Sequence, residues 1–349
     1  MRHRLPNDFF SRLMFNTDSK KKVVIAGVGG YVPEQILKND AIAKLVDTSD
    51  EWIATRTGIR ERRIAAPDQA CSDLAAEAGR AALENAGADP ESIDLLIVAT
   101  ITADAWTPST ACFVQPKLGL INATCFDISA ACSGFVFALD IGRQYILSGS
   151  ARRVMVIGAE KMSAITDWTD RGTCIIFGDG AGAVILEEGH GDSRGIISTA
   201  MGSDGQLASL IRVEAGGSAL PASAETVANH QHFIKMEGNQ VFKSAVRGMA
   251  DISLQALKMA GITSDQLTCI VPHQANVRII SAIADKLGVS MEHVVLNLDR
   301  FGNTTAASIP LALEEAVRDG RIVDGDYVLI VAFGAGLTGG ATVLQWGRR

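Results

Sequence analysis

The sequence lacks both the cysteine spacing of a disulfide-stapled protein and the apolar runs of a membrane protein. Its six cysteines are scattered and form no CxxC pair. Scattered cysteines in apolar runs favour reduced thiols over a disulfide framework, so we expect a cytoplasmic protein. No apolar run approaches the roughly 20 residues of a membrane-spanning helix. Residues 1–21 also lack the apolar core of a secretory signal. No membrane association is therefore expected.

The chain also lacks an excess of basic residues. Its net charge is −7 at pH 7 and its pI is near 5.4, which argues against a nucleic-acid-binding protein. With 47% apolar and 20% charged residues, the composition is that of an ordinary globular enzyme. A length of 349 residues suits about two domains, or one large duplicated domain.

Common cofactor and metal motifs are missing as well. The sequence contains no P-loop, no HExxH and no GxSxG elbow. Gly334, Gly336 and Gly339 formally match GxGxxG, but the helix and the acidic residue of a dinucleotide-binding unit do not follow. His230 and His232 could bind a metal ion as a pair, but the sequence suggests no third metal ligand beside them. We therefore predict no metal site and no cofactor.

Cys132 stands where a predicted strand turns into a predicted helix. Residues 124–128 are apolar and β-branched, and residues 133–148 follow a helical pattern. At such a junction the unpaired N–H groups and the helix dipole favour a thiolate. Taken alone, the stretch admits two interpretations: a nucleophile at an anion site, or a small buried hydrophobe.

Strands and helices alternate along the rest of the chain. The predicted strands are residues 22–28, 93–100, 153–158, 269–271 and 294–298, and the predicted helices are residues 72–86, 111–118, 241–260 and 276–287, with another after Asn303. We expect a turn at Gly29-Gly30, two strands joined by a glycine-rich turn at residues 173–187, and loops over residues 188–228.

Two similar segments indicate that the chain contains a duplicated domain. FGDGAGAVIL at residues 177–186 resembles FGAGLTGGATVL at residues 333–344, within a predicted strand–turn–strand at residues 326–345. Repeated strand–helix units ending in matching segments predict a duplicated α/β domain around a layered core. We expect residues 22–190 and 191–349 to form the two halves, after a disordered N-terminal extension of residues 1–21.

Two further polar residues share the setting of Cys132. His273 and Asn303 each follow a predicted strand and precede a predicted helix. In stacked α/β folds such strand ends gather at one crevice. A lone histidine there is more often structural, and a lone asparagine a turn former. Together with a cysteine, they favour nucleophilic acyl chemistry.

These stretches resemble a known family. DISAACSGF around Cys132, VPHQANVRII around His273 and LDRFGNTTAASIP around Asn303 are similar to three signatures of β-ketoacyl-acyl-carrier-protein synthase III. VDTSDEWIATRTGIRERRIA at residues 46–65 and DRGTCIIFGDGAGAV also resemble that family, and the similarity runs from about residue 22 to residue 345. It implies a thiolase-like α/β/α/β/α core of two similar halves, and a homodimer.

The resemblance also implies an activity. Cys132 would take an acyl group from coenzyme A and condense it with malonyl on acyl carrier protein, releasing carbon dioxide and giving the 3-oxoacyl product that initiates fatty acid biosynthesis. Backbone N–H groups of Cys132 and of Ala335 or Gly336 would hold the oxyanion. His273 and Asn303 would donate hydrogen bonds to the enolate, without a general base.

The same resemblance implies the binding residues. For coenzyme A these are Trp52 and Arg171 on the adenine ring, Arg56 near the phosphates, and Asn239 and Asn276 along the pantetheine tunnel. Ser49 or a neighbour can cap a helix that carries Trp52 and Arg56 on one face. For the acidic carrier protein they are Lys243, Arg247, Gln274, Arg278 and Lys286. Asp285 weakens this basic rim.

Two departures from the family concern the primer pocket. Gly339 stands where relatives often have tryptophan, and Thr107, after Trp106, where many have phenylalanine. Both changes predict a pocket wider than that of acetyl-restricted relatives, unless Trp106 fills the vacated space.

Three rival functions stay open at this point. One is a related thiolase-like condensing enzyme that makes a secondary metabolite from another acyl thioester. A thioesterase-like hydrolase would need a base, which Asn303 cannot be. A silent acyl-binding partner has no need of the full cysteine, histidine and asparagine set.

Overall fold

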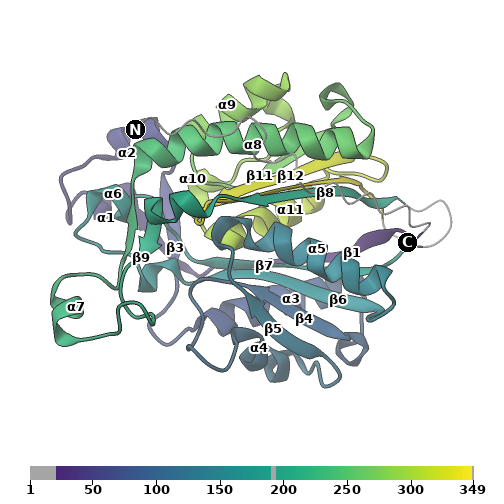
Figure 1. Cartoon of the computed structure of the whole chain (residues 1–349), viewed down its shortest axis with the longest axis horizontal. Helices are drawn as coiled ribbons and strands as arrows, with labels where there is room; N and C mark the ends of the chain where they lie inside the picture. Colours follow the sequence, from purple (N-terminus) through teal and green to yellow (C-terminus); the bar gives the residue numbers. More distant parts are fainter. Residues whose placement is uncertain (1–20, 190–193, 348–349) are drawn as a thin grey trace.

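Two β-sheets form the framework of the chain. The computed structural model describes residues 21–189 and 194–347 (Figure 1). The predicted N-terminal extension lies outside the described residues, apart from Lys21, and so does the predicted boundary between the halves. The first sheet has the order β1 (Val23–Tyr31), β7 (Gly180–Glu188), β6 (Arg153–Glu160), β4 (Leu95–Ala99) and β5 (Thr124–Ile128). The second has the order β8 (Gly195–Ser203), β13 (Thr338–Gln345), β12 (Tyr327–Gly334) and β11 (Cys269–Pro272).

The second sheet repeats the pairing of the first. In each sheet the first strand pairs antiparallel with the second, the second pairs antiparallel with the third, and the third pairs parallel with the fourth. A single parallel bridge between Ile270 and Val294 stands where the first sheet has its fifth strand. The two similar sequence segments therefore correspond to equivalent places: residues 177–186 lead into β7 of the first sheet, and residues 333–344 belong to the β12–β13 hairpin of the second.

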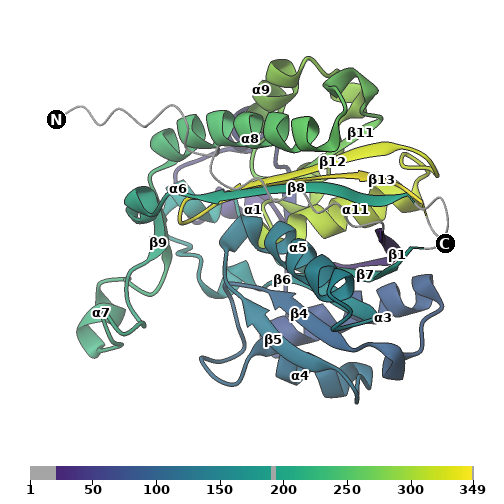
Figure 2. The same ribbon diagram turned by 45° about the vertical axis from the view of Figure 1, so that its right-hand side comes forward.

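Two helices lie between the sheets, α5 (Gly134–Leu147) and α11 (Ser308–Arg318), and each contacts strands of both (Figure 2). Helices α3 (Cys71–Ala86) and α4 (Thr110–Leu118) cover the outer face of the first sheet. Helix α8 (Gly238–Ala260), with α9 (Val277–Leu287) beside it, covers the outer face of the second. The five layers confirm the predicted thiolase-like α/β/α/β/α core. The central layer is mainly apolar, as Phe135 of α5 and Ile309 of α11 illustrate with exposed fractions of 0%.

Short elements surround this core. They are α1 (Asn39–Ile42), α2 (Asp50–Thr57), α6 (Arg171–Cys174), α7 (Ala224–Ala228), α10 (Leu298–Phe301), the strand pairs β2 (Gln35–Lys38) with β3 (Glu61–Ile64) and β9 (Ile211–Val213) with β10 (Ile234–Met236), and the 3₁₀ turns η2 (Ala131–Ser133) and η7 (Thr305–Ala307). Within the described chain, no helix is both long and apolar enough to cross a bilayer.

Several sequence predictions need correction. Gly29 and Gly30 lie inside β1 and form no turn. Residues 173–187 hold the end of α6 and the single strand β7 rather than two strands. The glycines of β7 serve close packing, since a Cβ at Gly182 would lie 2.7 Å from the backbone of α11. The predicted loop region contains β8, and the strand predicted at residues 294–298 is reduced to the bridge at Val294 before α10.

Candidate active site

A strained turn presents Cys132 at the start of α5. Ala131, the residue before it, has a φ of 46°, in the left-handed region that residues other than glycine rarely adopt. The second half contains the same left-handed residue, because Thr305 in η7, just before α11, has a φ of 44°. In both halves a 3₁₀ turn therefore leads into the central helix with its backbone bent toward the space between the sheets.

The Cys132 thiol is protonated at neutral pH. Burial raises its pKa to about 12, the Glu160 carboxyl adds to the shift, and the residue's own backbone N–H opposes it. The expectation that the helix N-terminus favours a thiolate is therefore wrong, because burial has the larger effect on the thiol.

His273 follows β11 and is almost fully buried. Burial lowers its pKa to about 3, so the imidazole is neutral at physiological pH. Its Nδ1 lies 2.7 Å from the Oγ of Ser308 at the start of α11. The Ser308 hydroxyl has one proton and two acceptors in reach, because the carbonyl oxygen of Thr305 lies 2.9 Å away. The direction of the Ser308 O–H bond therefore determines whether Nδ1 or Nε2 of His273 carries the imidazole proton.

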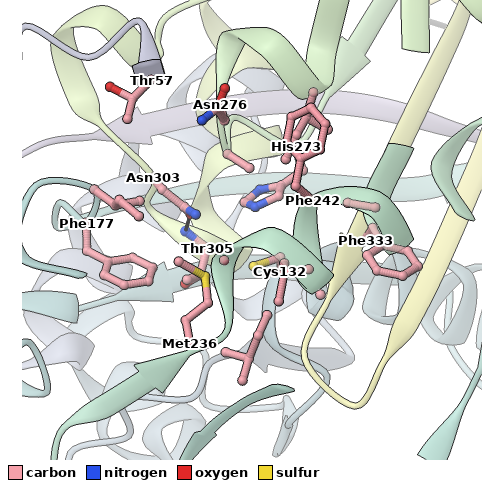
Figure 3. Close-up of a pocket in the computed structure, with 18 of the residues that line it drawn as sticks. Thr57, Cys132, Phe177, Met236, Phe242, His273, Asn276, Asn303, Thr305 and Phe333 are labelled. Atoms are coloured by element: carbon pink, nitrogen blue, oxygen red, sulfur yellow. Dashed lines mark hydrogen bonds between the residues drawn. The ribbon is translucent and has the colours of Figure 1, made fainter. Parts of the chain in front are cut away.

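The side-chain orientation of Asn303 is fixed by a backbone contact. Its Oδ1 accepts a hydrogen bond of 2.9 Å from the N–H of Thr305. Its backbone N–H donates to the carbonyl of Ile176 over 2.9 Å, and its carbonyl accepts from the N–H of Gly178 over 3.2 Å. Since Oδ1 is engaged, the amide presents its NH₂ group to the cavity (Figure 3).

One cavity of about 330 Å³ joins the three polar residues. Cys132, His273 and Asn303 all line it, and Figure 3 shows them around the same space. Cys132 follows β5 of the first sheet and His273 follows β11 of the second, as the sequence predicts, whereas Asn303 follows the short helix α10 rather than a strand. No carboxylate is among the described residues that line this cavity. Its side chains are mainly apolar, so charge that develops inside meets few solvating groups.

The backbone positions narrow the choice for the second oxyanion donor. Cys132 and Ala335 line the cavity, whereas Gly336 does not. Of the two alternatives left by the sequence, the cavity lining therefore favours Ala335.

The primer-pocket prediction needs correction. Trp106 is 85% exposed and Thr107 is also exposed, while Gly339 is buried inside β13, between β12 and β8. None of the three lines the cavity of this chain. The apolar side chains that line it include Ile101, Phe177, Ile211, Ile234 and Met236. Sequence reasoning missed Ile211 because β9 lies within residues 188–228, where the sequence has no clear periodicity.

The predicted coenzyme A residues lie in the cavity lining or, for Arg171, beside Trp52, which lines it. Ser49 caps α2 by accepting from the N–H of Trp52, over 3.1 Å. The Arg56 and Arg171 guanidinium carbons lie 4.2 and 5.0 Å from the centre of the Trp52 ring. The predicted residues that also line the cavity are Trp52, Arg56, Asn239 and Asn276. Arg171 must swing off the indole before a flat ring can stand between them.

Four of the five predicted carrier-protein residues are exposed on α8 and α9: Lys243, Arg247, Arg278 and Lys286. Gln274 is the exception, with an exposed fraction of 0%. Its amide donates to the carbonyls of Pro272 and Val295 and accepts from the N–H of Asn297. Gln274 therefore holds the chain around His273 together and cannot contact a partner.

A thiol at the start of a central helix, with a neutral imidazole and an amide NH₂ group facing the same closed space, defines a cysteine-dependent condensing acyltransferase of thiolase-like fold. Comparison with known proteins agrees with this class. Residues 126–205 match the family model described as 3-oxoacyl-[acyl-carrier-protein] synthase III, and residues 257–346 match the model of its C-terminal part.

Relatives extend the match over most of the chain. The β-ketoacyl-[acyl-carrier-protein] synthase III of Clostridioides difficile is 51% identical over 325 residues, covering 93% of this chain and 98% of that protein. The crystal structure of 3-oxoacyl-[acyl-carrier-protein] synthase III from Aquifex aeolicus has a TM-score of 0.86 and 45% identity, and the match covers 93% of this chain and 100% of that one. A priming β-ketosynthase of a polyketide biosynthetic pathway has a TM-score of 0.87 and 37% identity, with 96% and 99% covered.

The chain belongs to the β-ketoacyl-acyl-carrier-protein synthase III family. It is an acyltransferase, and the family's reaction initiates fatty acid synthesis by condensation.

Proposed function

We propose that the chain transfers an acyl group from acyl-coenzyme A to Cys132 and condenses it with malonyl-acyl-carrier protein, giving 3-oxoacyl-acyl-carrier protein and carbon dioxide. The observation that carries this proposal is the pairing of a thiol with two neutral hydrogen-bonding side chains in a cavity without a carboxylate. A hydrolase would need a base to activate water, and the described lining offers no carboxylate for that task.

In the first half-reaction the Cys132 sulfur attacks the thioester carbonyl. The carbon–sulfur bond to coenzyme A breaks, and coenzyme A leaves as the thiol with the proton that Cys132 loses. The backbone N–H groups of Cys132 and Ala335 support the negative charge on the carbonyl oxygen. Trp52, Arg56 and Arg171 hold the nucleotide end of coenzyme A, with Asn239 and Asn276 along the pantetheine arm.

In the second half-reaction malonyl loses its carboxylate as carbon dioxide. The electron pair of the broken carbon–carbon bond forms an enolate, whose charge collects on the thioester oxygen. The NH₂ group of Asn303 and the Nε2–H of His273 donate to that oxygen. The enolate carbon then attacks the acyl group on Cys132 and expels the thiolate. An apolar cavity favours this step, because the carboxylate loses hydration before its charge is dispersed.

If His273 donates a hydrogen bond through Nε2, Ser308 has to donate one to its Nδ1. Only the imidazole tautomer protonated on Nε2 can donate to the enolate, and in that tautomer Nδ1 is an acceptor that needs a donor. The Ser308 hydroxyl must then donate to Nδ1 rather than to the Thr305 carbonyl. Ser308 therefore selects the tautomer for condensation.

The basic residues exposed on α8 and α9 support an electrostatic contact with an acidic carrier protein, despite the net charge of −7. A homodimer and a cytoplasmic location belong to the same proposal, carried over from the family and from the unpaired cysteines. The primer stays open, because the residues behind the wide-pocket expectation do not line this cavity.

Mass spectrometry of the intact protein after incubation with acetyl-, butyryl-, hexanoyl- and octanoyl-coenzyme A tests the first half-reaction. Release of labelled carbon dioxide from malonyl-carrier protein tests the second. A protein that is acylated by these donors but never decarboxylates malonyl-carrier protein would contradict the proposal and favour a related enzyme with another extender.

A further inference from the structure

Arg62, on β3, is the bulkiest of the fully buried side chains in the described chain, with an exposed fraction of 0%. Burial lowers its pKa to about 10, so the guanidinium is still charged at neutral pH. A buried charge is costly unless its protons meet good acceptors. The proposed reaction assigns no task to this arginine.

Three oxygen atoms from two segments, residues 37–39 and residue 175, accept its hydrogen bonds. Nη1 donates to Oδ1 of Asn39 over 2.8 Å and to the carbonyl of Leu37 over 3.2 Å. Nη2 donates to the carbonyl of Ile175 over 2.7 Å. None of these hydrogen-bond partners is a carboxylate. The planar guanidinium holds the two segments at fixed positions relative to β3.

One of these segments holds the backbone of Asn303. Ile175 is followed by Ile176, whose carbonyl accepts the N–H of Asn303, and by Phe177, which bridges Asn303 in parallel register. Gly178 closes the contact by donating its N–H to the carbonyl of Asn303. Gly178 also packs on the arginine itself, because a Cβ there would lie 2.9 Å from the Cβ of Arg62.

The opposite side of Arg62 leads to the coenzyme A helix. The amide of Asn39 donates to Oδ1 of Asp50 and to the carbonyl of Ile59, each over 2.8 Å. Asp50 is the first residue of α2, which carries Trp52. One guanidinium thus links the start of α2 with the segment that holds Asn303, whereas Cys132 is carried by β5 and α5.

We propose that Arg62 is a positioning residue for Asn303: it holds residues 175–178 so that the Asn303 amide meets the thioester oxygen of malonyl during decarboxylation. The proposal rests on the proposed function of Asn303. Its effect on rate falls on the second half-reaction, because the Ile175 contact leads to Asn303 and not to Cys132. The contact through Asn39 leads to α2 and bears on the binding of acyl-coenzyme A, so acylation is compared at saturating acyl-coenzyme A. A displacement of about 1 Å in such a donor can cost up to roughly 10²-fold in rate.

The test compares Arg62→Lys and Arg62→Met with Arg63→Met. Arg63 is the matched control: it is the next residue of β3, points to the other face, and donates to the carbonyls of Pro33 and Glu34. For each protein we measure Cys132 acylation by mass, carbon dioxide release from malonyl-carrier protein, and the thermal midpoint. Arg62→Lys keeps the charge, so it carries the test if Arg62→Met does not fold.

We expect Arg62→Lys to slow decarboxylation by about tenfold and acylation by less than about twofold, with Arg63→Met near wild type in both. In an Asn303→Ala background, Arg62→Lys should cost less than about twofold in decarboxylation, because residues that act through one another are not additive.

Equal losses in both half-reactions, or a full tenfold loss in the Asn303→Ala background, would overturn the positioning role. A wild-type protein that never decarboxylates malonyl-carrier protein would instead refute the proposed function, so the two failures can be told apart.

Discussion

Replacing Asn303 by aspartate tests the proposed chemistry most sharply. The two side chains have nearly the same shape, and one oxygen of the new carboxyl can still accept the Thr305 N–H. The other end changes from an NH₂ donor into an oxygen that faces the developing enolate. Asn303→Ala removes the donor and adds no charge, so it serves as the reference variant.

Loss of one donor to a developing oxyanion costs about 10²–10³ in rate, or roughly 2.7–4 kcal/mol. We therefore expect Asn303→Ala to slow carbon dioxide release by about that factor. Asn303→Asp should be slower still at pH 8, because a carboxylate repels the enolate. Acylation of Cys132 in the Ala variant should change much less, because backbone N–H groups support that oxyanion.

The pH dependence provides the refuting measurement. A carboxyl group in an apolar cavity has a pKa above its ordinary value of about 3.9. Below that pKa it is neutral and can donate, so carbon dioxide release by Asn303→Asp, divided by that of wild type, should rise as the pH falls from 8 to 5. His273, with a pKa of about 3, contributes no change in this window. A ratio that is flat or falls toward low pH, or equal loss of both half-reactions in Asn303→Ala, would refute the donor assignment.

Three further results are expected. Acyl-coenzyme A should add one acyl mass to wild type and to Cys112→Ser, and none to Cys132→Ser; a retained mass in the last protein would place the nucleophile elsewhere. Ser308→Ala should slow decarboxylation by about 10-fold or more with little change in acylation, because nothing then selects the Nε2–H tautomer of His273; unchanged carbon dioxide release would show that the tautomer needs no partner. Lys243→Glu should raise the KM for malonyl-carrier protein and flatten its dependence on salt, whereas Lys258→Glu, at the other end of α8, should not; equal effects would mean that the charge acts at long range only.

The sequence predicted that Cys132, His273 and Asn303 lie at one cavity, and the structure places them there. Local pattern was sufficient for Cys132 and His273, which follow β5 and β11, but the strand predicted before Asn303 is the short helix α10. The glycines of β1 and β7 misled the prediction, because the same residue serves tight turns and close helix packing. Only the partner helix distinguishes these uses.

Other features depend on residues far apart in the chain. The contact of His273 with Ser308 spans 35 positions, and that of Arg62 with Ile175 spans 113. No periodicity or motif spacing encodes such pairs. The thiol pKa was mispredicted for a similar reason: the helix N-terminus can be read from the sequence, but the depth of burial and the nearby Glu160 come from the fold.

The repeated turn before α5 and α11 bears on ancestry. Ala131 and Thr305 share an unusual backbone conformation at corresponding places in the two halves, and the next residue is Cys132 in one half and Ala306 in the other. A duplicated gene first encodes two equivalent sites. In the proposed function one half supplies the nucleophile, while the other supplies Asn303 and Ser308 around the same turn. Neither half is then catalytically complete alone, and each chain holds one acyl group at a time.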